Sequence, residues 1–311
     1  MPAARFEGHI VDNPLDPEYA RASASIKKAG FEPADPLKMP IDEARAVQDR
    51  YFAFLAKDPP DVSSVRNFEL QGPAGAFATR IYYPVKAAAL PVIVFVRGGG
   101  WWAGTLASHD RTMRLLAKES GMAVCGVDYH RAPEAHYPTQ LNEVLETVRW
   151  LRAEGADVGV DAGRIVLAGE SAGANLCSLA AARMKPEERP AIRGLGLFYG
   201  NYALPGPQTR EYSKRVWLQY LGTDLERADP AAVPMNAEVA GLPPAWLGVG
   251  EADPLLGDTL RFAQKLGAAG VPCEVKRYPG LPHAFVMLNR IYDGAAGAVR
   301  DLATAAQRFV A

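Results

Sequence analysis

The chain has 311 residues, of which 49% are hydrophobic, so it can bury a sizeable core and is not a disordered polypeptide. Its 34 basic residues nearly cancel its 35 acidic ones, which argues against a nucleic-acid partner. No apolar stretch approaches the roughly 20 residues of a bilayer-spanning helix, so we expect no membrane span.

The N-terminal sequence predicts a cytoplasmic protein. Glu7, His9 and Asp12 stand where a secretory signal would carry its apolar segment. The cysteines, 3 in number, lie far apart and form no CxxC pair, so we expect free thiols.

Amphipathic helices are predicted in residues 1–57. The first helix starts at Asp16 and Pro17 and stops at Gly30, and a second carries apolar residues along one face between positions 41 and 55. We interpret this segment as N-terminal cap helices.

The next segment, residues 58–201, is predicted to begin a sheet. A polar, alternating antiparallel pair runs from Val65 to Val85, with its turn near Gly72 and Gly75. Short apolar runs then alternate with helical stretches. Because the runs are apolar at nearly every position, they indicate strands of a mostly parallel sheet that helices cover on both faces. These runs are 91–96, 123–127, 165–168, 195–199, 245–249 and 273–278.

Residues 202–235 interrupt this alternation with an aromatic stripe. The stripe either covers the core or joins the N-terminal helices in a lid over the carboxyl ends of the strands, where open α/β sheets bind ligands. We adopt the second interpretation and treat residues 202–235 as a cap segment, with residues 236–311 as the second part of the core. The stripe consists of Tyr212, Val216, Trp217, Tyr220 and Leu221.

The strongest chemical signal is the sequence GESAG at Gly169–Gly173, between a predicted strand and a helix rich in small residues. A serine at so sharp a turn has strained backbone angles, and the flanking glycines let the strand and the helix approach each other. The turn exposes the hydroxyl above a helix N-terminus, whose N–H groups favour an oxyanion. We therefore predict that Ser171 is a nucleophile.

A nucleophilic serine needs a base, and in this architecture the chain order is serine, acid, histidine. His283 is the one histidine beyond Ser171, in a turn-rich loop after the last predicted strand. Asp253 follows the preceding strand, and Glu251 is the second candidate for the acid. The acid would accept the Nδ1–H of the histidine and stabilise its imidazolium form.

Gly98–Gly100 follow the first parallel strand and let backbone N–H groups approach a substrate oxygen, as an oxyanion hole requires. With Ala103 they also match the GxGxxA fingerprint of dinucleotide-binding loops. We discount that interpretation because a pyrophosphate loop enters its helix at once. Here Trp101 and Trp102 continue the loop, and no good helix is predicted before about His109.

These motifs, in this order, resemble the hormone-sensitive lipase family of α/β-hydrolases, which includes bacterial carboxylesterases. Members carry GDSAG, DPL and HGF or HAF, and this chain has GESAG, DPL at Asp253–Leu255 and HAF at His283–Phe285. The resemblance implies the α/β-hydrolase fold, with a mostly parallel central sheet flanked by helices and a helical cap. It also implies Ser171 as nucleophile, Asp253 as acid, His283 as base, and the N–H groups of Gly99, Gly100 and Ala172 as the oxyanion hole.

The chain departs from the family where the usual HGGG loop begins with Arg97. An arginine there either orients the loop by bonding nearby carbonyl oxygens or offers a charge to an acidic substrate. We expect the substrate pocket to be lined by Arg97, Trp101, Trp102, Glu170 and Trp217.

The family motif DYRLAPE is replaced by DYHRAPE at Asp128–Glu134, which we interpret as a structural loop. Asp128, His130 and His136 lack a fourth partner of the kind that metal sites need, so we expect no metal. The triad chemistry likewise calls for no cofactor.

The sequence thus predicts a serine carboxylesterase that hydrolyses short to medium acyl esters through an acyl-enzyme intermediate. Its partner would be a small-molecule ester, and related hydrolases form dimers, which leaves a homodimer as an expectation. Two alternatives stay open. One is a catalytically inactive small-molecule receptor on the same scaffold, and the other is an amidase or lactonase that uses the same triad.

Overall fold

The computed structural model describes residues 5–6, 14–31, 39–206 and 209–311. The segment that holds Glu7, His9 and Asp12 lies outside these ranges. In the parts described, no helix combines the length and the apolar character that crossing a bilayer needs.

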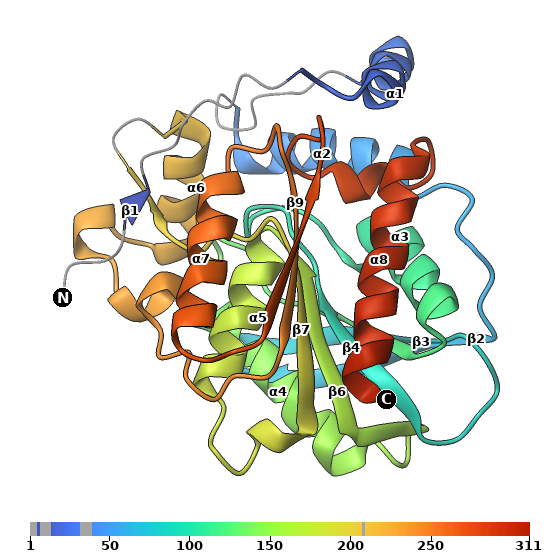
Figure 1. Cartoon of the computed structure of the whole chain (residues 1–311). Coiled ribbons are helices and arrows are strands. Elements are labelled where there is room, and N and C mark those ends of the chain that lie inside the picture. Colours follow the sequence, from blue (N-terminus) through green and yellow to red (C-terminus); the bar gives the residue numbers. More distant parts are fainter. Residues whose placement is uncertain (1–4, 7–13, 32–38, 207–208) are drawn as a thin grey trace.

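An eight-stranded sheet forms the centre of the molecule (Figure 1). Its strands are parallel apart from the pairs that β3 makes with β2 and β5, which are antiparallel. This architecture confirms the mostly parallel sheet with an antiparallel pair at its start. In spatial order the strands are β10 (Cys273–Tyr278), β9 (Ala245–Gly250), β7 (Ile192–Phe198), β6 (Val160–Glu170), β4 (Leu90–Val96), β5 (Ala123–Asp128), β3 (Gly75–Tyr83) and β2 (Ser64–Gly72).

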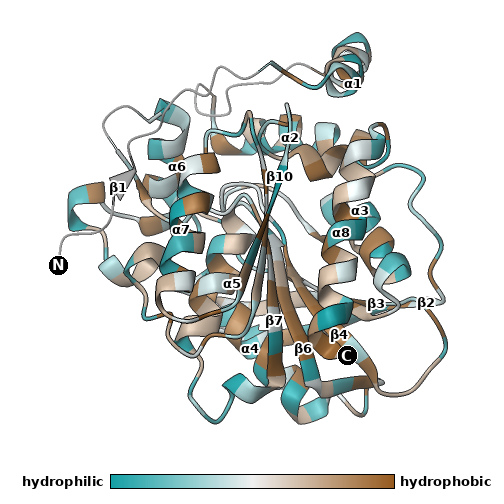
Figure 2. Cartoon of the chain, in the orientation of Figure 1, coloured by the Kyte–Doolittle hydropathy of each residue, from teal (hydrophilic) through white to brown (hydrophobic). Residues whose placement is uncertain are grey.

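Helices cover both faces of the sheet. In Figure 1, α3 (Leu106–Ser120) and α8 (Asp293–Val310) lie on one side, and α4 (Thr139–Glu154), α5 (Ala172–Arg183) and α7 (Leu256–Ala268) lie on the other. The central strands carry the hydrophobic colouring in Figure 2 because both of their faces are packed against helices.

Helix α3 begins earlier than the sequence predicts, at Leu106 and not near His109. Thr105 accepts a hydrogen bond from the Ser108 N–H, and the Ser108 hydroxyl accepts one from the Thr105 N–H. This reciprocal cap satisfies two donors at the helix start, and it needs no acidic residue in the first turn.

Helices α1 (Pro17–Lys28), α2 (Ile41–Leu55) and α6 (Glu211–Leu221) lie beyond the carboxyl ends of the strands (Figure 1). The predicted start of α1 is confirmed, since the Asp16 carboxylate accepts from the first-turn N–H groups of Glu18 and Tyr19. The remaining elements are the paired strands β1 (Arg5–Phe6) and β8 (Leu204–Pro205) and the short 3₁₀ helices Arg189–Ala191, Leu225–Arg227, Pro230–Ala232, Pro234–Asn236 and Phe285–Leu288.

Candidate active site

The predicted site residues follow the carboxyl ends of neighbouring parallel strands and therefore lie at one edge of the sheet. Strands β10, β9, β7, β6 and β4 are consecutive in the sheet. Because they are parallel, their carboxyl ends face the same way. Residues that are distant in the chain therefore meet at this edge.

Ser171 occupies the sharp turn between β6 and α5. Its backbone has φ +52° and ψ −116°, a conformation that costs energy for any residue with a side chain. The turn is tight because Gly173 lies against the Val96 carbonyl, which a Cβ at position 173 would overlap. Gly169 is equally constrained, since a Cβ there would lie 2.7 Å from the same oxygen.

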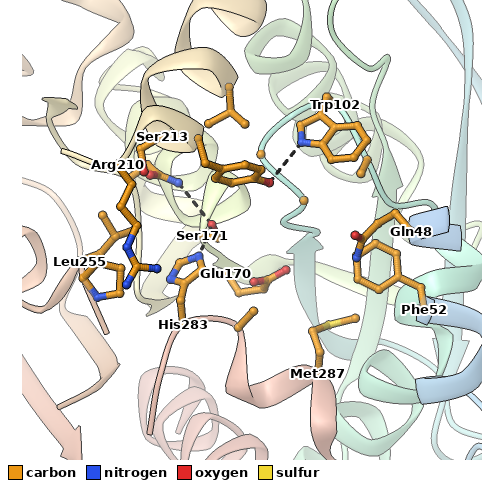
Figure 3. A pocket seen from close by; sticks show the side chains of 18 of the residues that line it. Gln48, Phe52, Trp102, Glu170, Ser171, Arg210, Ser213, Leu255, His283 and Met287 are labelled. Carbon is orange, nitrogen blue, oxygen red and sulfur yellow. Dashed lines mark hydrogen bonds between the residues drawn. The ribbon is translucent and has the colours of Figure 1, made fainter. Parts of the chain in front are cut away.

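A continuous hydrogen-bonded chain joins the three predicted triad residues, of which Figure 3 labels Ser171 and His283. The Ser171 hydroxyl oxygen lies 2.9 Å from Nε2 of His283. Nδ1 of the same ring lies 2.9 Å from the nearer carboxylate oxygen of Asp253. The carboxylate itself is fully buried and accepts a bond of 2.7 Å from the Leu255 N–H. This arrangement can take a proton from the serine and hold the resulting imidazolium.

Competing influences set the pKa of His283. Burial disfavours the charged ring, but the charge and hydrogen bond of Asp253 outweigh burial and raise the pKa above its ordinary value. The second candidate acid, Glu251, lies apart from this chain, and its carboxylate pairs with Arg277 at 2.9 Å.

The glycine loop after β4 makes a tight turn. Gly99 and Gly100 both have positive φ, at +101° and +58°, and the Gly99 carbonyl accepts from the Ala103 N–H at 3.0 Å. Within the described residues, no group accepts a hydrogen bond from the N–H of Gly99 or Gly100. Ala172 is the first residue of α5, where an N–H has no partner within the helix. These donors are suited to an oxyanion.

Glu170 connects the nucleophile turn to the glycine loop. Its Oε1 accepts from the Gly98 N–H at 2.7 Å and lies 3.1 Å from Nε2 of His109. Burial would raise the pKa of Glu170, but the hydrogen bond and charge of His109 outweigh burial and lower it. The carboxylate therefore anchors the loop, and it also lines the cavity, as expected from the sequence.

Arg97 orients the loop and does not face the cavity. Its guanidinium donates to the carbonyls of Ala103 and Tyr129, each at 2.8 Å, and pairs with Asp128 at 3.2 Å. It also lies over the Tyr129 ring, and 2% of the residue is exposed. Of the two roles the sequence left open, the structure supports the one in which Arg97 bonds carbonyl oxygens. The expectation that it lines the pocket is wrong.

The chain also matches known proteins in sequence and in fold. A family model described as the alpha/beta hydrolase fold matches residues 93–287, well over half of the chain. The chain belongs to this family.

Solved structures of other hydrolases are similar to this one over almost their whole length. An esterase from Pyrobaculum calidifontis is 27% identical, with a TM-score of 0.86, and the match covers 96% of this chain and 100% of that one. The metagenomic carboxylesterase EstE1 is 27% identical, with a TM-score of 0.84 and coverages of 88% and 99%. A mutant form of the esterase rPPE is 26% identical, with a TM-score of 0.83 and coverages of 99% and 99%.

A cavity of about 300 Å³ opens above Ser171 in this α/β-hydrolase, a size at the lower end for small-ligand sites. Helices α2 and α6 supply much of its wall. The side chains contributed by these helices are Gln48, Tyr51 and Phe52 from α2 and Tyr212, Ser213 and Val216 from α6.

The predicted tryptophans divide into two groups. Trp102 lines the cavity and donates from Nε1 to the Tyr212 hydroxyl at 3.3 Å. Trp101 and Trp217 do not line it, which contradicts the expectation for both. They are buried with Tyr220, on which Trp101 stacks at 4.2 Å between ring centroids. This cluster joins the glycine loop to α6.

Sequence reasoning missed several residues of the cavity, among them two polar ones near the triad. Asn201 donates from Nδ2 to the Ser171 hydroxyl at 3.3 Å, and Arg210 lies on the cavity wall. Asn201 follows the carboxyl end of β7, and its position after a predicted strand was the available signal. Arg210 precedes α6, and no pattern in the sequence singled it out.

The polar residues considered as metal ligands each have other partners. Asp128 pairs with Arg97, the His130 ring bonds the Glu143 carboxylate at 2.5 Å, and the His136 ring bonds the Gln219 carbonyl oxygen at 2.8 Å. The described residues contain no cluster of acidic, histidine and cysteine side chains arranged for a metal.

Proposed function

We propose that this α/β-hydrolase is a serine carboxylesterase of the hormone-sensitive lipase type. The observation that carries the proposal is the hydrogen-bonded chain from Ser171 through His283 to Asp253 at the floor of a cavity whose wall is mostly apolar. The esterases with similar structures support the same reaction class.

In the proposed reaction, Ser171 attacks the ester carbonyl while His283 accepts its proton. The N–H groups of Gly99, Gly100 and Ala172 stabilise the oxyanion, and His283 then gives the proton to the departing alcohol. A water molecule, activated by the same imidazole, releases the acid from the acyl-enzyme.

We further propose that residues 1–57 and 202–235 act as a cap over this site. Helices α2 and α6 come from these segments and carry part of the cavity wall. The cavity volume of about 300 Å³ suits the short end of the acyl range better than a long lipid chain. Both the cytoplasmic location and the homodimer stay predictions from the sequence.

The test is a Ser171→Ala variant assayed with p-nitrophenyl butyrate. We expect a fall in kcat of at least about 10³-fold, because the nucleophile is lost while the fold is unchanged. Undiminished turnover by the variant would overturn the proposal.

Covalent labelling separates an esterase from an inactive receptor on the same fold. A fluorophosphonate should modify Ser171 in the native protein, because its hydroxyl is hydrogen-bonded to a base, and should not modify the Ser171→Ala variant. A native protein that binds small molecules but resists the reagent would favour the receptor.

A further inference from the structure

Arg210 places a positive charge on the cavity wall. Apart from the catalytic imidazole, the charged side chains that line the cavity are Glu170 and Arg210. The Glu170 carboxylate already accepts a hydrogen bond from the Gly98 N–H and is hydrogen-bonded to the His109 ring. No hydrogen bond or ion pair joins the Arg210 guanidinium to another of the described residues, although its backbone carbonyl accepts from the Ser213 and Lys214 N–H groups. Within the described part of the chain, the cavity therefore offers a cation whose charge is not neutralised.

The guanidinium lies on the histidine side of the site. Figure 3 draws the Arg210 side chain on the same side of Ser171 as His283 and Leu255, and all of these residues line the cavity. Its charge also acts on the imidazole. Burial and Asp253 have the largest influences on the pKa of His283, and the positive charge of Arg210 adds a smaller lowering effect.

The histidine must reach the leaving oxygen of the ester, because it gives that oxygen a proton. The alcohol half of the substrate consequently lies against the imidazole, on the side where Arg210 is found. Apolar side chains, among them Phe52, Val216 and Met287, line other parts of the same cavity.

We propose that Arg210 binds a carboxylate carried by the alcohol half of the ester substrate. The inference rests on the proposed esterase function and adds a substrate class, namely esters whose leaving alcohol is anionic. A guanidinium recognises a carboxylate through paired N–H donors.

A bound carboxylate would also assist the chemistry. During the reaction His283 becomes positively charged, and Arg210 nearby opposes that charge. An anion on the guanidinium offsets this repulsion. An anionic ester should therefore have a higher kcat as well as a lower KM than a neutral one.

The experiment compares 4-(acetoxymethyl)benzoate with 4-(acetoxymethyl)benzamide, two acetates of similar shape that differ in charge. Rates are expressed per active site titrated with fluorophosphonate, so that misfolded protein is not counted. The readout is the ratio of kcat/KM for the anionic ester to that for the neutral one. Benzyl hydrogen succinate, whose carboxylate lies in the acyl half, tests the orientation.

In the native protein we expect the ratio to favour the anionic ester. Arg210→Gln should lower the ratio about five- to tenfold, the range for a charge-assisted contact at a partly exposed site. Arg210→Lys should keep part of the preference and Arg210→Glu should reverse it. Arg215→Gln removes an exposed arginine of α6 that does not line the cavity, and it should leave the ratio unchanged.

The same ratio in the native protein and in Arg210→Gln would overturn the inference, with the esterase function intact. A preference that depends on Arg210 for benzyl hydrogen succinate, and not for the benzoate, would overturn the assignment to the alcohol half. Failure of the native protein to hydrolyse any of these esters would overturn the proposed function, and the inference with it.

Discussion

Asp253 is hydrogen-bonded to the His283 ring and, against the lowering effect of burial, raises the pKa of that ring. A base works only while it is neutral, so activity should fall as the pH drops through the raised pKa of His283. Asp253→Asn removes the charge that raises this pKa, and the acidic limb of the kcat/KM profile should move to lower pH. The rate itself should fall by about 10⁴-fold, because the wrong imidazole tautomer is favoured.

Glu251→Gln is the matched control for this variant. Its carboxylate pairs with Arg277 and makes no hydrogen bond to His283, so activity and pH profile should be retained. A loss as large as that of Asp253→Asn would show that the acid has been misassigned.

Glu170 is expected to act as a positioning residue, through the bond from the Gly98 N–H. Glu170→Gln removes the charge that faces His109 and should loosen the glycine loop. Because oxyanion donors act in the transition state, kcat should fall by about tenfold or more with little change in KM. Glu170→Asp, which keeps the charge, should recover part of the loss. A change confined to KM would contradict this role.

At the scale of elements, the junction of β6 and α5 depends on glycine. Gly173→Ala would place a Cβ against the Val96 carbonyl, which is held in the sheet and cannot move away easily. We expect the free energy of unfolding to fall by about 3 kcal/mol, with loss of esterase activity. Urea unfolding followed by circular dichroism measures the change.

Helix α7 offers the matched glycine. A Cβ at Gly267 would meet nothing within 4 Å, and the residue lies inside the helix. Gly267→Ala should therefore raise the free energy of unfolding by about 0.5 kcal/mol, because alanine loses less backbone entropy on folding. Equal destabilisation by both substitutions would mean that contact with Val96 is not the cause.

At the scale of the whole molecule, Arg45 joins α2 to the loops around the site. Its guanidinium donates to the carbonyls of Trp102 and Ala132 and pairs with Glu134. The hydrogen bond from Arg45 lowers the pKa of Glu134 to about 2. A lowered carboxyl pKa stabilises the fold above its ordinary value of 4.5, and this stabilisation is lost as the pH falls toward 2.

Glu134→Gln should therefore lower the Tm near pH 7 and match the native protein near pH 2. The loss in free energy of unfolding near pH 7 should stay below about 1 kcal/mol, because 56% of the Glu134 side chain is exposed and solvent screens the ion pair. The exposed Glu187→Gln serves as control and should leave the melting curve unchanged at each pH. Thermal melts across that range measure the effect, and a constant difference down to pH 2 would contradict the assignment to this ion pair.

Much of the fold could be predicted because its signals are local. The apolar runs that became β4, β6 and β9 and the capped start of α1 depend on residues a few positions apart. The sequence GESAG likewise describes one turn, whose strain and glycine spacing are properties of neighbouring residues. Chain order then pointed to His283 and Asp253, since the order of such elements in this architecture is known.

The sequence by itself therefore predicted the main elements, their type and the residues that we propose to react. Only the tertiary structure decided that Arg97 bonds the loop carbonyls and that Trp101 is buried and does not line the cavity. It also decided that Asn201 donates to the Ser171 hydroxyl and that Arg210 lies on the cavity wall. The physical reason is that such contacts depend on the order of strands in the sheet and on the packing of α6, which bring together residues with no relation in the chain. Local sequence patterns do not predict such contacts between residues that are distant in the chain.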